Sequence, residues 1–156
     1  MEDGPNKTIW GKAQKQWFYD TVGASEATFK VLITSSPILG PDRKNKNDNL
    51  SNAGYSFEQA EILNFIKKQK NLFIVNGDRH WQYVSNVKNT NLWEFGCGAG
   101  ADVHAGGWKQ EDFLPEHRFL RVKGGFLSVS VSSGNLPSIE FTHHDVEGNP
   151  VNKVGF

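Results

Sequence analysis

Residues 73–85 read FIVNGDRHWQYVS, an apolar run that breaks off into a cluster of charged and titratable side chains. The apolar part, together with Leu72, is short and contains β-branched residues, as is typical of a strand buried on both faces of a parallel sheet. A second run of this kind, KVLIT, occupies residues 30–34. The sequence therefore predicts two buried strands, at residues 30–34 and 72–76.

Two amphipathic segments predict the helices that accompany these strands. In residues 11–25, Trp17, Phe18 and Val22 share one helical stripe, and residues 57–69 carry apolar side chains at helical spacing. Because the second helix lies between the two strands, we expect a right-handed crossover that makes the strands parallel neighbours. Residues 37–55 are rich in Pro, Gly and Asn and predict a long loop, which is often functional.

The second half of the chain has a different pattern. Short alternating segments separated by turn residues, QYVSNV with NLWEFG and GGFLSVSVSS with PSIEFTHHD, predict antiparallel hairpins. We therefore predict an α/β fold in which a β-α-β unit with parallel strands is followed by antiparallel strands. The length of 156 residues suits one domain.

Composition excludes several classes of partner. Lysine plus arginine and aspartate plus glutamate both number 17, so no overall field attracts nucleic acid or an anionic membrane. The chain has no apolar run of the length that a membrane span needs, and its first residues lack the pattern of a signal peptide. Cys97 is the one cysteine, which excludes an internal disulfide and a cysteine-based zinc site.

The cluster after residue 76 is the main candidate site, because ligands of parallel sheets bind beyond the carboxyl ends of the strands. Asp78 and His80 could ligate a metal there, since carboxylates suit hard cations and imidazoles suit transition metals. Gly77 is expected to permit the turn, while Arg79 offers a fork of donors to a phosphate and Trp81 a flat wall. The alternative is a plain ion pair between Asp78 and Arg79.

Cations and a second Asp-x-His triplet extend this candidate site. Arg43 and Lys44, with Lys46, lie in the long loop and could approach a phosphate ester, unless they are merely solvated. Asp102 and His104 repeat the triplet spacing in a glycine-rich segment, which is either a loop that closes over the site or a plain surface loop.

Three other titratable groups are weaker candidates. His143 and His144 follow an alternating strand, so one should face inward and one outward beside a turn, and metal binding there is the less favoured interpretation. Cys97 lies among glycines and is expected to be a buried or half-buried thiol without a catalytic role.

Several motifs resemble the alkaline phosphatase D family, the PhoD-like metallophosphatases. The resemblance extends over FIVNGDRHWQYVS, the upstream segment IWGKAQKQWFYDTVGASEATFKVLITSSPI and the downstream segment WEFGCGAGADVHAGG. Gln14 and Trp17 match a helix that precedes a strand in that family, and Asp78 and His80 match its Gly-Asp-x-His metal ligands. The resemblance implies part of a calcineurin-like sandwich, a periplasmic or secreted location, and hydrolysis of phosphate mono- or diesters.

The resemblance also implies a limit, because the remaining metal ligands of the family lie in an amino-terminal half that has no counterpart here. Residues 1–156 are thus expected to be the carboxyl-terminal part of one domain and to be inactive by themselves. The metal ions that the resemblance implies for the complete site are iron with calcium, or manganese or zinc. The cut sheet should expose an edge through which copies self-associate. A noncatalytic binding or interaction module is the alternative function.

Overall fold

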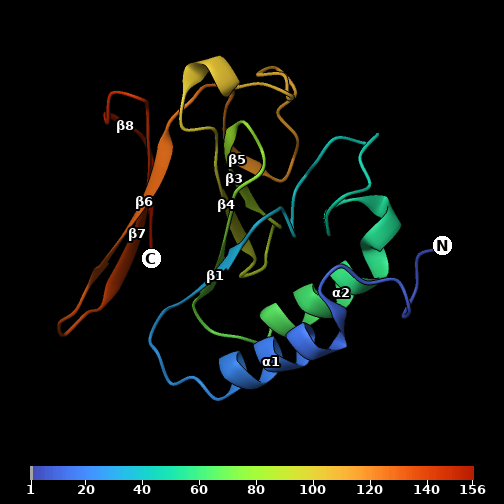
Figure 1. The fold of residues 1–156 in the computed structure, drawn as a ribbon. Coiled ribbons are helices and arrows are strands. Elements are labelled where there is room, and N and C mark those ends of the chain that lie inside the picture. Colours follow the sequence, from blue (N-terminus) through green and yellow to red (C-terminus); the bar gives the residue numbers. More distant parts are fainter. Residues whose placement is uncertain (1) are drawn as a thin grey trace.

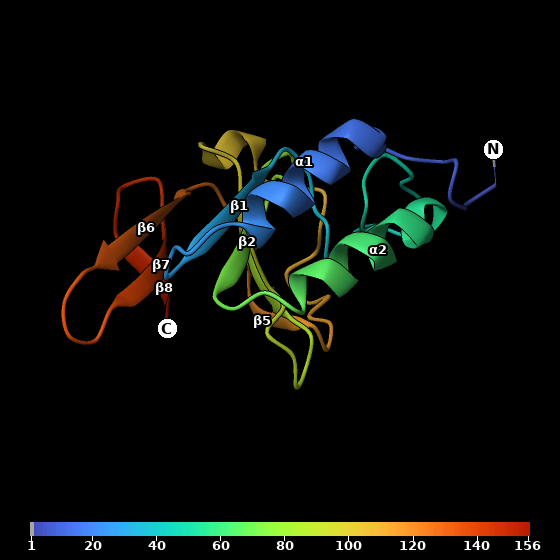
Figure 2. The same ribbon diagram turned by 90° about the horizontal axis from the view of Figure 1, so that it is seen from below.

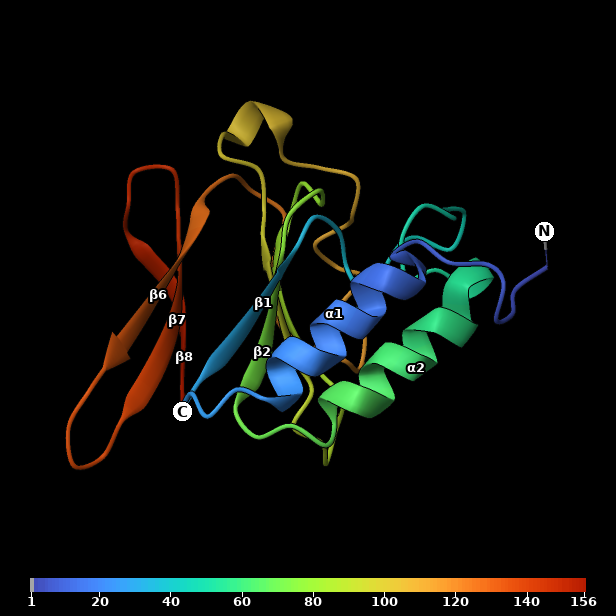
Figure 3. The same ribbon diagram turned by 60° about the horizontal axis from the view of Figure 1, so that its bottom comes forward.

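A computed structural model, which describes residues 2–156, arranges the chain in three layers (Figure 1). Two helices cover one face of a five-stranded sheet, and a three-stranded sheet covers the other face. Figures 2 and 3 show the same order from two further directions, with both helices on one side. The carboxyl-terminal strands therefore cover the face of the central sheet that the helices leave free.

The helices α1 (Gly11–Gly23) and α2 (Ser56–Ile66) confirm the two predicted helices, although each ends two or three residues earlier than predicted. On α1, Phe18 is buried against α2, whereas Trp17 from the same predicted stripe is 64% exposed. Within residues 2–156, neither helix has the length and apolar character that crossing a membrane requires.

The central sheet confirms the predicted β-α-β unit. Strands β1 and β2 are parallel, with Lys30 opposite Leu72 and Thr34 opposite Asn76, and β2 is parallel to β4. Strand β3 is antiparallel to β4 and β5, which confirms the predicted hairpin. The order is β1-β2-β4-β3-β5, with these bounds: β1 (Lys30–Thr34), β2 (Leu72–Asn76), β3 (Gln82–Asn86), β4 (Trp93–Cys97) and β5 (His117–Arg121).

Strand β2 lies between two cores. Leu72 and Ile74 pack toward the helices, and the alternate residues Phe73 and Val75 pack toward the second sheet. Successive side chains of a strand point to opposite faces, so both faces of β2 must be apolar. This explains why the stretch before the candidate site is a continuous apolar run.

The second sheet consists of three antiparallel strands, β6 (Phe126–Ser132), β7 (Ser138–His144) and β8 (Pro150–Gly155). It is joined to the central sheet by aromatic packing. The rings of Phe95 and Phe141 stack with centroids 4.0 Å apart and planes 8° apart. The predicted hairpin of β6 and β7 is confirmed, and it forms its own sheet.

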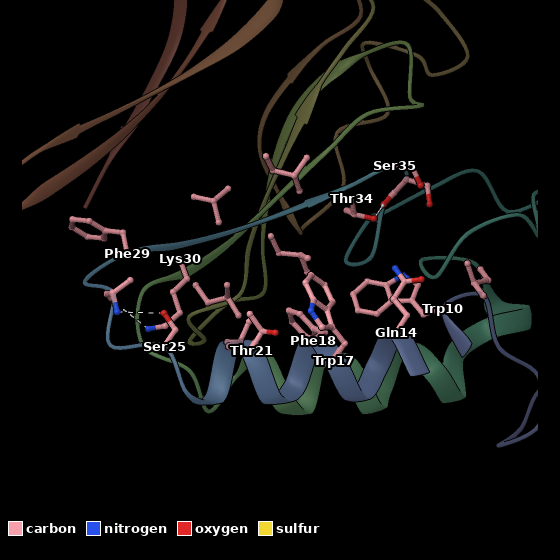
Figure 4. A pocket seen from close by; sticks show the side chains of 18 residues that line it. Trp10, Gln14, Trp17, Phe18, Thr21, Ser25, Phe29, Lys30, Thr34 and Ser35 are labelled. Atoms are coloured by element: carbon pink, nitrogen blue, oxygen red, sulfur yellow. Dashed lines mark hydrogen bonds between the residues drawn. The ribbon is translucent and has the colours of Figure 1, made fainter. Parts of the chain in front are cut away.

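Strand β1 is an edge of the central sheet, with Ile33 79% exposed. Between β1 and α1 runs a groove of about 620 Å³, and Figure 4 shows Trp10, Gln14 and Trp17 of α1 and its approach facing the strand. The predicted open edge is thus present in the described part of the chain. Self-association through this edge stays a prediction.

His143 belongs to the core between the sheets. Its ring packs 5.0 Å from that of Phe119, and its Nε2 lies 3.0 Å from the carbonyl oxygen of Gly96, to which it donates. Burial lowers the pKa of His143 from 6.5 to about 4. His144 is only half-buried, so the predicted inward and outward alternation is confirmed, and His143 has a structural place in the core.

We expect His143 to make stability depend on pH. As the pH falls from 6.5 to about 4, the unfolded chain takes up a proton on this imidazole that the folded chain does not, so the free energy of unfolding decreases. Urea denaturation at several pH values should show that the free energy of unfolding decreases less with falling pH in His143→Gln than in the wild type. In His144→Gln this free energy should depend on pH as it does in the wild type. An unchanged dependence in His143→Gln would contradict this assignment.

Candidate functional site

Strand β2 ends in a tight turn at the carboxyl edge of the central sheet. The backbone N–H of Arg79 donates to the carbonyl of Gly77 at 2.7 Å, and Asp78 has a φ of 64°. The residue with the left-handed conformation is Asp78, which directly follows Gly77, the residue expected to permit the turn. Aspartate tolerates this conformation better than most residues, because its short side chain can bond locally.

The guanidinium of Arg79 is enclosed by carboxylates. Its Nη2 donates to Asp42 at 2.5 Å and to Asp48 at 2.9 Å, and its Nη1 donates to Asp78. Arg79 is 3% exposed and the side chain of Asp42 is fully buried. The prediction that Arg79 presents its donors to a substrate is therefore corrected: these donors already bind protein carboxylates, and Arg79 holds the long loop against the end of β2.

Both partners of the central ion pair are charged. Burial opposes ionisation of Asp42, but hydrogen bonds from the Asn49 amide, the Arg43 backbone N–H and the Arg79 guanidinium outweigh it and hold the pKa of Asp42 below 3.8. Burial likewise opposes the charge of Arg79, yet the bond to Asp42 raises the pKa of Arg79 above its ordinary value. The pair is thus ionised at neutral pH.

Trp81 also differs from its predicted role. Its ring is 1% exposed, because Trp108 stacks on it with centroids 5.3 Å apart and the guanidinium of Arg43 lies 5.5 Å from its centre. A buried ring cannot offer an open flat wall to a ligand. Trp81 instead supports the two residues that cover it.

A pocket of about 360 Å³ lies at this turn and brings together most of the predicted site residues. His104 comes to it from the 3-10 helix η2 (Asp102–His104), and the backbone N–H of Gly106 donates to the carbonyl of His80 at 3.0 Å. Lys44 does not line this pocket. The lining residues are Arg43, Lys46, Asp48, Asp78, Arg79, His80, Trp81, His104, Gly106 and Gly107.

The buried carboxylate of Glu94 fixes the start of the long loop. It accepts the backbone N–H groups of Ile38, Leu39 and Gly40 at 2.8, 2.7 and 2.9 Å, and the hydroxyl of Tyr83 at 2.7 Å. Burial raises the pKa of Glu94, and these hydrogen bonds oppose the rise. The loop therefore leaves β1 in one fixed direction, toward the end of β2.

The Tyr83 hydroxyl extends this network to the turn. It accepts a hydrogen bond from the side-chain amide of Asn76 at 2.8 Å, two residues before Asp78. The ring of Tyr83 lies over Gly96, where a Cβ atom would be 2.2 Å from the ring, so β4 needs a glycine at this position. Glu94, Tyr83 and Asn76 thus join three strands beneath the site.

Sequence reasoning missed three acidic residues of this arrangement, Asp42, Asp48 and Glu94. Glu94 had a detectable signal, because it is a charged residue in the middle of the apolar strand NLWEFG and so needs buried partners. The two aspartates lie in the long loop among many polar residues, and no spacing there distinguishes them.

The described residues do not form a complete metal centre. Asp78 and His80 line one pocket, but no group of three or more His, Cys, Asp or Glu side chains that could hold a metal ion occurs in residues 2–156. Asp42 and Asp48 are bound to Arg79. Cys97 is half-buried and burial raises the pKa of its thiol, which suits the inert role predicted for it.

Removal of the Arg79 guanidinium should leave the buried Asp42 carboxylate with only the looser contact to Arg43, whose Nε lies 3.7 Å away. We expect Arg79→Ala to lower the free energy of unfolding by about 3–5 kcal/mol in urea denaturation. Lys46→Ala is the matched control, because Lys46 lies 3.9 Å from Asp48 at the surface, and it should cost less than about 1 kcal/mol.

A second substitution makes this test specific. Asp42→Asn in the Arg79→Ala background removes the buried charge that has lost its closest cation, so the double variant should be more stable than Arg79→Ala alone. Equal losses for Arg79→Ala and Lys46→Ala, or additive losses in the double variant, would contradict the described ion-pair cluster.

Comparisons with known proteins show what this chain is similar to in sequence and in fold. The family model described as PhoD-like phosphatase matches residues 1–145. Alkaline phosphatase D of Bacillus subtilis (strain 168) is 30% identical over 122 residues, which cover 66% of this chain and 20% of that protein. The solved structure of PhoD is similar in fold, with a TM-score of 0.62 at 18% identity over 94% of this chain and 36% of that chain.

The chain thus spans about a fifth of the length of the curated relative that it matches. The similarity in fold confirms the predicted class, an α/β chain that forms part of a calcineurin-like sandwich. The match over residues 1–145 confirms the predicted relationship as well, and this chain belongs to the PhoD-like phosphatase family.

Proposed function

We propose that residues 1–156 form the carboxyl-terminal part of a single PhoD-like domain and supply a phosphoryl-binding part of its active site. The observation that most supports this proposal is the pocket beyond β2, where Asp78 and His80 lie with Arg43 and His104. These residues come from the strand end, the long loop and η2. Separate segments of the chain thus contribute polar groups to one pocket, as binding sites do.

Cations of the long loop can compensate the charge of a phosphoryl group without Arg79. The side chain of Arg43 is 32% exposed, and its nearest carboxylate oxygen, on Asp42, lies 3.7 Å from its Nε. Lys46 is 3.9 Å from Asp48. Because both pairs are loose, these groups are free to donate to phosphoryl oxygens, where charge-assisted hydrogen bonds are strong.

Asp78 and His80 are the metal ligands that we assign to this chain. A bound metal would supply a Lewis acid and lower the pKa of a bound water. Two donors are too few, since zinc takes about four ligands and calcium about six or more. We therefore assign no step to a metal ion, and we expect this chain by itself to be inactive. The metals proposed for the complete site are iron with calcium, or manganese or zinc.

The remaining assignments are also proposals. The substrate is a phosphate mono- or diester, and the balanced net charge of the chain argues against nucleic acid as a partner. A periplasmic or secreted location follows from the family resemblance. Self-association would use the open edge of β1.

Binding of inorganic phosphate tests this proposal without requiring catalysis. Titration calorimetry of the 156-residue chain, with iron, calcium, manganese or zinc added in turn, should detect binding that Arg43→Ala and His80→Ala each weaken about tenfold. Glu147→Ala, an exposed residue in the turn between β7 and β8, is the control and should bind like the wild type.

Two outcomes would count against the proposal. If phosphate does not bind, or if all variants bind it with equal affinity, the pocket is not a phosphoryl-binding site. Hydrolysis of p-nitrophenyl phosphate that disappears in Asp78→Ala would show that this chain has a complete site, and would overturn its assignment as an inactive part.

A further inference from the structure

A second pocket adjoins the phosphoryl-binding pocket. Its volume is about 660 Å³, within the range that holds small organic ligands. The two pockets share Arg43 and Gly107 as a common boundary. The second pocket is lined by Asp42, Arg43, Lys44, Gly107, Trp108, Lys109, Asp112 and Leu114.

The absence of a side chain at Gly107 leaves space at the boundary between the two pockets. It has a φ of 85°, and a Cβ atom there would lie 3.1 Å from Nη1 of Arg43 and 3.4 Å from the ring of Trp81. A side chain at position 107 would therefore crowd the residues between the two pockets. A ligand bound at Arg43 can extend from one pocket into the other.

One wall of the second pocket is a rigid aromatic surface. Trp108 stacks on buried Trp81, its indole N–H donates to the carbonyl of Asp112 at 3.0 Å, and its ring meets that of His117 edge to face at 5.8 Å. Leu114 continues this apolar surface. A wall held on several sides loses little side-chain entropy when a flat group packs against it.

The rim of the second pocket is positively charged. Lys44 and Lys109 are exposed and form no ion pair with any residue from 2 to 156. Of the two carboxylates in the lining, Asp42 is already paired with Arg79, which leaves Asp112. The pocket thus combines an apolar wall with an excess of cations, and these attract different parts of one ligand.

We propose that this second pocket binds the alcohol portion of the ester, and that the substrate class is a phosphate ester whose alcohol carries a flat or apolar group and a second negative charge. The inference rests on the proposed function, because it requires the phosphoryl group to lie beside Arg43. The flat group packs against Trp108 and the second charge lies at Lys44 and Lys109. The sequence predicts that Lys44 binds substrate, and in this arrangement Lys44 contacts the charged group of the alcohol portion.

Three probes separate the contributions of the two pockets. Titration calorimetry would compare inorganic phosphate, 4-methylphenyl phosphate and 4-carboxyphenyl phosphate, of which the last two differ in charge at nearly equal size. We expect the aryl esters to bind about tenfold more tightly than phosphate, because the ring is buried. The carboxylate of 4-carboxyphenyl phosphate should increase the affinity about fivefold further, and this increase should become smaller as the salt concentration rises.

The lysines are tested by the ratio of affinities for the two aryl esters. Lys44→Ala/Lys109→Ala should bring this ratio close to one, and Leu114→Ala should weaken both aryl esters alike. Lys12→Ala/Lys88→Ala removes two exposed lysines that do not line this pocket and should retain the ratio of the wild type.

The results distinguish this inference from the proposed function. If phosphate binds but the aryl esters bind no more tightly, or if the ratio is the same in both double variants, the second pocket does not hold the alcohol portion and the phosphoryl site stands. If phosphate itself does not bind, the proposed function fails and this inference fails with it.

Discussion

The site depends on one buried carboxylate. Glu94 lies in the middle of β4 and accepts three successive backbone N–H groups from the start of the long loop, together with the hydroxyl of Tyr83. A buried charge is costly unless it is hydrogen-bonded, and these partners offset part of the burial that raises the pKa of Glu94. Because the three N–H groups belong to consecutive residues, the carboxylate fixes the direction in which the chain leaves β1. Every residue that the loop brings to the site depends on this direction.

A second ionic contact then completes the arrangement at the other side of the loop. The loop residues Asp42 and Asp48 bind Arg79, which follows β2 in the chain, so the loop is held both at its start and over the strand end. This use of Arg79 leaves Arg43 and Lys46 as the loosely paired cations of the pocket. This difference in role between Arg79 and the two loop cations has a physical reason. A guanidinium that satisfies buried carboxylates is a poor partner for a ligand that binds and dissociates.

Much of the fold follows from local patterns, and the details of the site do not. The continuous apolar runs of β1 and β2, with a helix between them, are sufficient to predict parallel neighbours, since both faces of β2 are covered. The same reasoning placed Asp78 and His80 at a strand end. It could not show that Arg79 and Trp81 are buried, because their partners, the loop carboxylates and Trp108, lie between 27 and 37 residues away in the sequence and meet them only in the folded chain.

Hydrogen exchange of the backbone amides tests most directly whether Glu94 organises the site. In Glu94→Gln the carboxylate loses its charge and presents an NH₂ group to N–H donors. If the account is right, the amides of Ile38, Leu39 and Gly40 exchange at least about tenfold faster than in the wild type, as expected for the loss of charge-assisted hydrogen bonds. The amide of Phe141 in β7 serves as the internal reference for global unfolding and should change much less. Equal exchange of the three loop amides in both proteins would show that the loop is held by other contacts and would contradict the central role of Glu94.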